Sequence, residues 1–222
     1  MKAALTGGIA CGKSTFAKFL SELGIRVLDA DDVVHELEAP GGEAVPAIVA
    51  RFGRSVLAPD GGIDRPKLAE LVFAQGERGR WGPWGPWGQS PSSQQSPSSP
   101  KETLEAILFP IVRKRLRVFS ETSPEGVFSL AIIPLLFESH FDSDYDTIIA
   151  IASPEEVQID RMMRTRGYSR AQAEARLAAQ MPVAEKVARA HFVVVNDSTP
   201  ERLRKEAVRL AAWLEERAKH EQ

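Results

Sequence analysis

Short apolar segments alternate with longer amphipathic stretches along this chain of 222 residues. A short apolar run between turn residues is typical of a buried strand, and an apolar face with helical periodicity indicates a helix. The predicted strands cover residues 1–6, 25–28, 127–133, 146–152 and 192–195. Strands separated by helices favour an α/β fold in which a five-stranded parallel sheet carries helices on both faces.

The amphipathic stretches predict the helices. Residues 14–23 place their large apolar side chains on one face, and Gly24 ends that helix. Ser153 is predicted to cap a helix beginning at Pro154, with Glu156 completing a capping box. The other predicted helices cover residues 33–38, 43–52, 65–73, 101–119, 169–180 and 200–218.

Residues 76–100 differ in composition from the rest of the chain. A Trp-Gly-Pro repeat at residues 81–88 precedes a tract of Ser, Pro and Gln, which lacks the apolar surface needed to order itself. We expect an exposed, mobile loop. The tryptophans indicate either a docking site for a partner or a tolerated insertion, and the small entropic cost of lengthening a loop favours the insertion.

Composition narrows the class of protein. A net charge of −2 gives no reason to expect a nucleic-acid partner, and a single cysteine excludes an internal disulfide framework and suits a reducing cytosol. The chain has no apolar N-terminal signal and no uncharged run of 18 apolar residues. We therefore expect a single-domain, soluble, cytoplasmic protein without a membrane partner, and the sequence gives no oligomeric state.

Residues 7–14, Gly-Gly-Ile-Ala-Cys-Gly-Lys-Ser, match the phosphate-binding pattern G-x-x-x-x-G-K-[ST] between a predicted strand and a predicted helix. Glycines let successive amides turn towards a polyphosphate, Lys13 supplies charge to the β and γ phosphates, and Ser14 supplies a ligand for Mg²⁺. The alternative, a strand-to-helix turn that binds nothing, is disfavoured by the correct flanking elements. The residues predicted to bind ATP here are Gly7, Gly8, Ile9, Ala10, Cys11, Gly12, Lys13, Ser14 and Thr15.

Acidic residues follow the second and third predicted strands. Asp31 lies at the ligand-binding edge of an open α/β sheet, where it would accept the proton of an attacking hydroxyl. Capping of the next helix by Asp31 or Asp32 is an equally good interpretation. The third strand ends in Pro-Leu-Leu-Phe-Glu at residues 134–138, which leaves Asp29, Asp31 and Glu138 near the site, as in small-molecule kinases.

Two further features point to the nucleotide. Arg161 and Arg176 lie on a predicted helical hairpin that would fold over the phosphate loop as a lid and stabilise a transferring phosphoryl group. The alternative is a surface hairpin with ion pairs. Asn196 ends the last strand, where it would contact adenine or ribose, or cap the last helix.

The ordered set of motifs resembles dephospho-CoA kinase. The resemblance rests on residues 5–15 with Asp29-Ala30-Asp31, residues 134–138, Ala178-Ala179-Gln180 and Asn196-Asp197-Ser198, and spans nearly the whole chain outside residues 76–100. It implies a three-layer P-loop fold and transfer of the ATP γ-phosphate to the ribose 3′-hydroxyl of dephospho-CoA. The roles it implies are a base (Asp31), phosphate and Mg²⁺ binding (Lys13, Ser14), acceptor contacts (Pro134, Leu135, Leu136, Glu138) and lid arginines (Arg161, Arg176).

The domain organisation that we expect has three parts. The core comprises residues 1–35, 127–153 and 190–222, a helical acceptor-binding region comprises residues 36–126, and the lid comprises residues 154–189.

Two positions depart from the family pattern. The family commonly has histidine where this chain has Phe109, and arginine where it has Thr165, which lies between Arg164 and Arg166.

Two other functions fit the same residues. One is phosphorylation of a nucleoside or a nucleoside monophosphate, and the other is an ATP-binding interaction module whose catalysis has lapsed. A GTPase is disfavoured because Asn196 is the only asparagine, so the guanine-reading Asn-Lys-x-Asp motif is absent.

Overall fold

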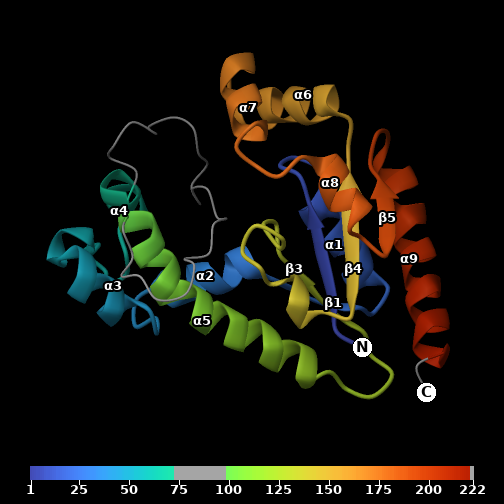
Figure 1. Cartoon of the computed structure of the whole chain (residues 1–222), viewed down its shortest axis with the longest axis horizontal. Helices are drawn as coiled ribbons and strands as arrows, with labels where there is room; N and C mark the ends of the chain where they lie inside the picture. Colours follow the sequence, from blue (N-terminus) through green and yellow to red (C-terminus); the bar gives the residue numbers. More distant parts are fainter. Residues whose placement is uncertain (73–98, 221–222) are drawn as a thin grey trace.

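The computed structural model describes residues 1–72 and 99–220, so the tryptophan repeat and most of the predicted loop lie outside the described residues. Its centre is a five-stranded sheet in the order β2-β3-β1-β4-β5, with every neighbouring pair parallel (Figure 1). The strands are β1 (Ala3–Gly7), β2 (Arg26–Asp29), β3 (Ser129–Ile132), β4 (Thr147–Ala152) and β5 (Phe192–Val195). The predicted parallel sheet is confirmed.

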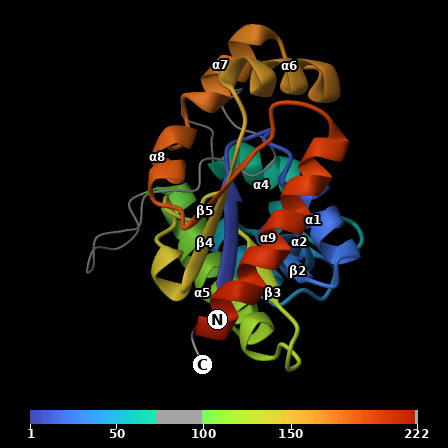
Figure 2. The ribbon, with the colours of Figure 1, turned by 90° about the vertical axis from the view of Figure 1, so that its right-hand side faces the viewer.

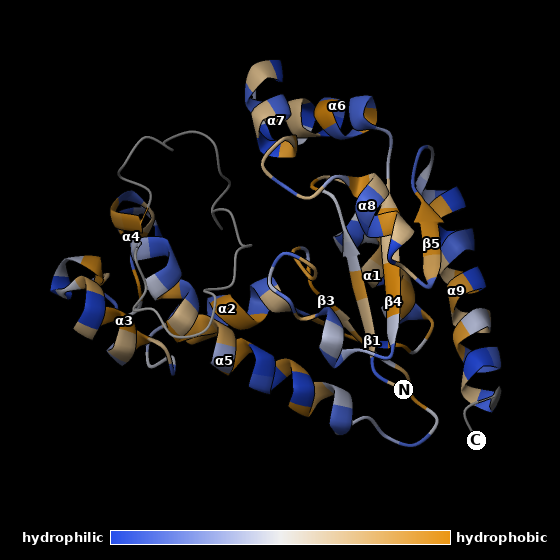
Figure 3. Ribbon diagram, viewed as in Figure 1, coloured by the Kyte–Doolittle hydropathy of each residue, from blue (hydrophilic) through white to orange (hydrophobic). Residues whose placement is uncertain are grey.

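Helices cover both faces of this sheet (Figure 2). On one face, α1 (Lys13–Glu22) and α9 (Pro200–His220) bury Phe16, Leu20 and Leu210 against the strands. On the other face lie α5 (Pro100–Glu121), which packs on β3, and α8 (Val183–Ala188), which packs on β1 and β4. A strand covered on both faces is apolar along its length, as β4 is in Figure 3.

A second hydrophobic cluster lies beside the sheet. It joins α5 to α2 (Ala30–Glu38), α3 (Val45–Phe52) and α4 (Arg65–Val72) through the buried side chains Leu37, Ile48, Leu68, Leu108 and Leu116. A 3-10 turn at Arg54–Val56 follows α3. The helical region predicted after the second strand therefore packs as a unit against α5 (Figure 1).

The helices α6 (Glu155–Arg166) and α7 (Arg170–Leu177) stand beyond the carboxyl ends of the strands (Figure 1). The capping box predicted at Ser153 is wrong, because α6 begins at Glu155 after Pro154 and, in the part of the chain described, no side chain caps it. The Ser153 hydroxyl instead donates to the carbonyl oxygen of Asn196 at 2.6 Å. A capping box does form at Ser169, and α8 was not predicted.

Within the described ranges 1–72 and 99–220, we find no helix with both the length and the apolarity needed to cross a bilayer.

The packing of α9 predicts that shortening a side chain to alanine affects stability differently on its two faces. Leu210 is fully buried against the sheet, so Leu210→Ala should lower the free energy of unfolding by about 2–5 kcal/mol through lost burial and a residual cavity. Val208 on the same helix is 53 % exposed and serves as the control. Val208→Ala should change the free energy of unfolding by less than about 0.5 kcal/mol. Urea unfolding measures both, and equal losses would contradict the assigned helix face.

Candidate functional site

The phosphate-binding loop joins β1 to α1, and its backbone is closely surrounded. A Cβ atom on Gly7 would lie 2.3 Å from the carbonyl oxygen of Ile151, and one on Gly12 would lie 2.3 Å from Asn196 Nδ2. Gly12 also has a φ of 90°, a left-handed conformation that favours glycine. Ala10 adopts a left-handed φ of 57° as well, which is uncommon for a residue with a side chain.

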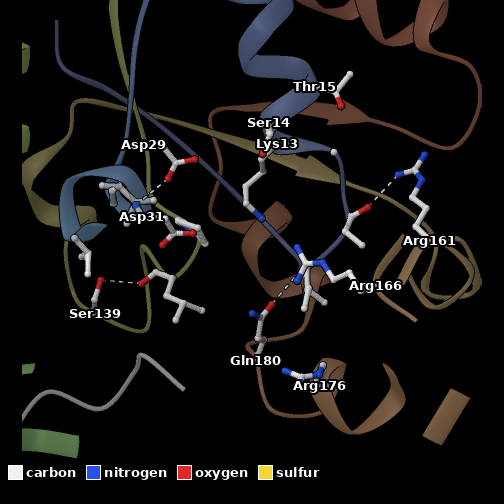
Figure 4. A pocket seen from close by; sticks show the side chains of 18 of the residues that line it. Lys13, Ser14, Thr15, Asp29, Asp31, Ser139, Arg161, Arg166, Arg176 and Gln180 are labelled. Atoms are coloured by element: carbon white, nitrogen blue, oxygen red, sulfur yellow. Dashed lines mark hydrogen bonds between the residues drawn. The ribbon is translucent and has the colours of Figure 1, made fainter. Parts of the chain in front are cut away.

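Three side chains from distant parts of the chain hold this loop. Gln180 Oε1 accepts a hydrogen bond from the amide of Ile9 at 3.2 Å. Arg161 Nη1 donates to the carbonyl oxygen of Ala10 at 3.1 Å, as Figure 4 shows. Asn196 Nδ2 donates to the carbonyl oxygen of Cys11 at 2.9 Å. The strained part of the loop is therefore fixed by protein contacts alone.

Lys13 is folded along the same loop. Its Nζ donates to the carbonyl oxygens of Gly7 and Gly8 at 3.0 and 2.9 Å. Burial lowers the pKa of its ammonium group, and the charges of Asp31 and Asp29 oppose that shift. A phosphate in the cradle would bring further negative charge to this ammonium group.

A cavity of about 720 Å³ opens in front of the loop (Figure 4). One end is formed by the loop and the start of α1, and the other by the apolar side chains of α5 and the segment after β3. Side chains of α6 and α7 line it as well. Its polar lining residues include Lys13, Ser14, Thr15, Asp29, Asp31, Ser139, Arg161, Arg166, Arg176 and Gln180.

Asp29, the last residue of β2, and Asp31, in the first turn of α2, have different contacts. Asp29 caps α2, because its Oδ1 accepts a hydrogen bond from the amide of Asp31 at 2.9 Å. The capping alternative for Asp31 and Asp32 is therefore wrong, and the Asp31 carboxylate faces the cavity (Figure 4). Burial, together with the neighbouring charge of Asp29, raises the pKa of Asp31 to about 6. A carboxylate with such a pKa is suited to accept a proton near neutral pH.

The arginines of α6 and α7 differ in their contacts, although Arg161, Arg166 and Arg176 all line the cavity. Arg161 is bound within the protein, since besides Ala10 it donates to Ser153 Oγ and to Asn196. Arg164 pairs with Asp160 in α6, which is the surface ion pairing that the alternative interpretation expected. Arg166 and Arg176 both line the cavity.

Arg176 is only 9 % exposed, and its guanidinium group lies over the ring of Tyr168 at 4.2 Å. Its Nε and Nη1 are buried and lack a hydrogen-bond partner among the described residues. Burial lowers the pKa of this group. An anion in the cavity would satisfy these donors, because a buried guanidinium without an acceptor is costly.

The predicted acceptor residues are only partly brought together. Asp31, Pro134 and Leu135 line the cavity, whereas Leu136 is fully buried in the core. Glu138 lies outside the cavity lining and pairs with Lys186 at 2.7 Å. Sequence reasoning missed Lys186, and no motif surrounding it signalled a role.

The predicted ATP residues also divide. Six line the cavity: Ile9, Ala10, Gly12, Lys13, Ser14 and Thr15. Gly7, Gly8, Cys11 and Asn196 do not line the cavity, and the side chains of Cys11 and Asn196 are buried. The buried side chain of Asn196 thus contacts the loop backbone, and it is Thr199, not Asn196, that accepts a hydrogen bond from the first turn of α9.

Phe109, which stands where the family commonly has histidine, lines the apolar end of the cavity. Its ring meets that of Phe141 edge to face, with centroids 5.5 Å apart. The position therefore contributes aromatic surface to the cavity.

Magnesium fits the donors that are present. The Ser14 hydroxyl and the carboxylates of Asp29 and Asp31 all line the cavity, and hard oxygen donors are those that Mg²⁺ prefers. No group of three or more His, Cys, Asp or Glu residues in the described ranges forms a metal cage by itself. Such a small protein contribution is usual for Mg²⁺, which is held largely by waters and substrate phosphates.

Comparison with known proteins now identifies the family. The family model described as dephospho-CoA kinase matches residues 1–81 and 95–201. The chain belongs to the dephospho-CoA kinase family. The family resemblance read from the motifs is thereby confirmed.

Individual dephospho-CoA kinases support the same assignment. The protein from Anaeromyxobacter dehalogenans is 41 % identical over 95 % of this chain and 90 % of its own length. The protein from Geobacter sulfurreducens is 38 % identical over 90 % of this chain and 91 % of its own. A crystal structure of a Thermus thermophilus protein matches with a TM-score of 0.71 at 30 % identity, covering 96 % of each chain.

The raised pKa of Asp31 in this dephospho-CoA kinase family member predicts a dependence of stability on pH. The pKa of Asp31 is about 6 in the folded chain and lower in the unfolded chain. As pH rises between these two values, the unfolded chain is favoured because it loses this proton more readily, so the free energy of unfolding falls. Asp31→Asn should therefore raise the free energy of unfolding at pH 7 by about 2–3 kcal/mol and add little at pH 3. Urea unfolding at both pH values, with exposed Asp32→Asn as the control, measures this. A loss of stability at pH 7 in Asp31→Asn would contradict the assignment.

Proposed function

We propose that this chain transfers the γ-phosphoryl group of ATP to the ribose 3′-hydroxyl of dephospho-CoA, forming coenzyme A in its last biosynthetic step. The observation that carries the proposal is that the Asp31 carboxylate and the phosphate cradle line one cavity. Family membership supplies the acceptor, and the geometry supplies the roles of individual residues.

On the donor side, the loop from Gly7 to Thr15 binds the ATP phosphates. Lys13 and Arg176 place positive charge at the cavity, and both would stabilise the charge that spreads over the transferring phosphoryl group. Ser14 would hold Mg²⁺, which neutralises phosphate charge when bound. Arg161 contributes indirectly, because its hydrogen bonds fix Ala10 in the cradle.

On the acceptor side, Asp31 accepts the proton of the 3′-hydroxyl as that oxygen attacks the γ-phosphorus. The bond from the γ-phosphorus to the β,γ-bridging oxygen breaks, and ADP leaves with its electron pair. Burial keeps the Asp31 pKa high enough for this proton transfer and low enough for ionisation at neutral pH. Pro134, Leu135 and Phe109 would form the wall against which the acceptor lies.

The regional assignments follow from the same cavity. Residues from the core, from the region 36–126 and from the lid 154–189 all contribute to its lining, which supports a donor site, an acceptor site and a lid. Within the lid range, α8 packs on β1 and β4, so it serves as the base of that lid. Cytoplasmic location stays a prediction, supported by the single cysteine.

Substitution of Asp31 tests the proposal directly. With Mg-ATP and dephospho-CoA, Asp31→Asn should lower kcat by about 10²–10⁴-fold because the base is lost, while ADP affinity changes little. Coupled measurement of ADP release gives the rate, and phosphorus NMR of the product shows which hydroxyl carries the phosphate. Adenosine and AMP serve as competing acceptors.

Turnover with adenosine or AMP alone would replace the acceptor assignment by a nucleoside or nucleotide kinase. ATP binding without turnover on any acceptor would instead indicate a lapsed module.

Ionisation of Asp31 also predicts the acid limb of the pH profile. Because only the carboxylate accepts a proton, kcat/KM should fall below a pH of about 6, the pKa of Asp31 in the free enzyme. Initial rates at constant ionic strength between pH 5 and 8 measure the limb. A profile that stays flat down to pH 5 would exclude Asp31 as the base.

A further inference from the structure

A buried ion pair lies behind the acceptor wall. Lys186 on α8 has a fully buried side chain, and Glu138, after β3, is 10 % exposed at its side chain. Lys186 Nζ donates to Glu138 Oε1 at 2.7 Å and to the carbonyl oxygen of Pro134 at 2.8 Å. Glu138 Oε1 also accepts a hydrogen bond from the amide of Met181 at 3.2 Å. The pair thus joins the segment after β3 to the segment that leaves the lid.

The pair is poorly explained as a source of stability. Removing two charges from water costs free energy that their attraction only partly recovers, and apolar residues of similar volume often stabilise a fold equally well. Glu138 Oε2 is also buried without a hydrogen-bond partner among the described residues. What the pair adds is defined geometry, because charge-assisted hydrogen bonds are directional.

That geometry connects the two substrate sites. The carbonyl oxygen of Pro134, which Lys186 holds, also accepts from Thr6 Oγ1 at 3.1 Å, and Thr6 directly precedes the phosphate loop. Pro134 and its neighbour Leu135 line the cavity on the acceptor side. The acceptor wall is therefore tied at one carbonyl group both to β1 and to α8.

The segment of residues 180–186 touches the donor side as well. Gln180 accepts from the amide of Ile9 in the loop. Val183, at the start of α8, packs so closely on Gly8 that a Cβ there would lie 2.5 Å from Val183 Cγ2. This seven-residue segment thus contacts the phosphate cradle through Gln180 and Val183, and the acceptor wall through Lys186.

We propose that Lys186 and Glu138 are positioning residues, which fix the acceptor wall relative to the phosphate cradle and so set the approach of the acceptor hydroxyl to the γ-phosphate. The inference rests on the proposed function. Neither side chain lines the cavity, so both act through Pro134 and Met181. Small displacements of reacting groups have large effects on rate, which makes such an indirect role measurable.

The test is a double-substitution cycle that separates positioning from stability. Lys186→Met and Glu138→Met should each lower the thermal midpoint, because each leaves one buried charge unpaired. The double variant should recover most of that midpoint, since it buries no charge. Its kcat should stay about ten- to a hundredfold below that of the unchanged protein, with ADP affinity within about twofold. Arg189→Met with Asp142→Asn, a half-exposed neighbouring pair, is the control and should retain kcat.

Recovery of both midpoint and kcat in the double variant would overturn the proposal, because the pair would then be only structural. If that variant fails to fold, Thr6→Val takes its place, since it removes one hydrogen bond to Pro134 at nearly constant volume. Thr6→Val should lower kcat about two- to tenfold with ADP affinity retained, and an unchanged kcat would overturn the proposal.

Hydrogen exchange tests the positioning role without measuring turnover, so its result is independent of the proposed function. The amides of Ser139, His140 and Phe141 donate to carbonyl oxygens of residues 135–137. They should exchange at least about tenfold faster in the double variant than in the unchanged protein, and Thr6→Val replaces the double variant in this measurement if the latter does not fold. Unchanged exchange there would overturn the positioning role even if no acceptor were turned over. Failure of the unchanged protein to phosphorylate dephospho-CoA, with faster exchange in the variant, would overturn only the proposed function.

Discussion

The structure depends on holding a short stretch of backbone in a conformation that it would not keep by itself. Amides that converge on a polyphosphate require left-handed residues, here Ala10 and Gly12. The strain at Ala10 persists because Arg161 and Gln180 bind the backbone on either side of it. The cradle is therefore assembled by the fold before any nucleotide arrives.

This constraint explains the arrangement of the surrounding elements. Gln180 lies between α7 and α8, Arg161 lies in α6 and Asn196 follows β5. Each of these side chains therefore connects a different part of the chain to the loop. The parallel sheet makes this possible because its strands end at one edge. The same edge brings Asp31 to the cavity, where burial raises its pKa to about 6.

Sequence reasoning recovered what local pattern determines. The sheet, the phosphate loop and the placement of Asp31 followed from apolar periodicity and one strong motif. The match to the family model confirms the family resemblance that the motifs indicated. Tertiary contacts decided the rest. Ser153 has a good capping sequence, yet its hydroxyl is drawn to Asn196, whose position depends on the pairing of β4 with β5.

The pairing of Glu138 with Lys186 was equally invisible from the sequence. The two residues lie 48 positions apart, as their numbers show, and no periodicity links them. Likewise, the packing of α6 and α7 decides that Arg161 binds the loop backbone, whereas Arg176 has buried donors without a partner among the described residues. Spacing alone placed Arg161 and Arg176 in one lid and gave them one role.

The most direct test of a loop assembled before nucleotide binding is amide hydrogen exchange, followed by NMR in nucleotide-free protein. The amides of Ile9 and Cys11 donate to Gln180 Oε1 and to the carbonyl oxygen of Gly8. Both should exchange at least about tenfold more slowly than an unstructured peptide, and Gln180→Leu should release Ile9. Exchange of Ile9 at the unstructured rate in the unchanged protein would contradict the account, because the loop would then be ordered only by its ligand.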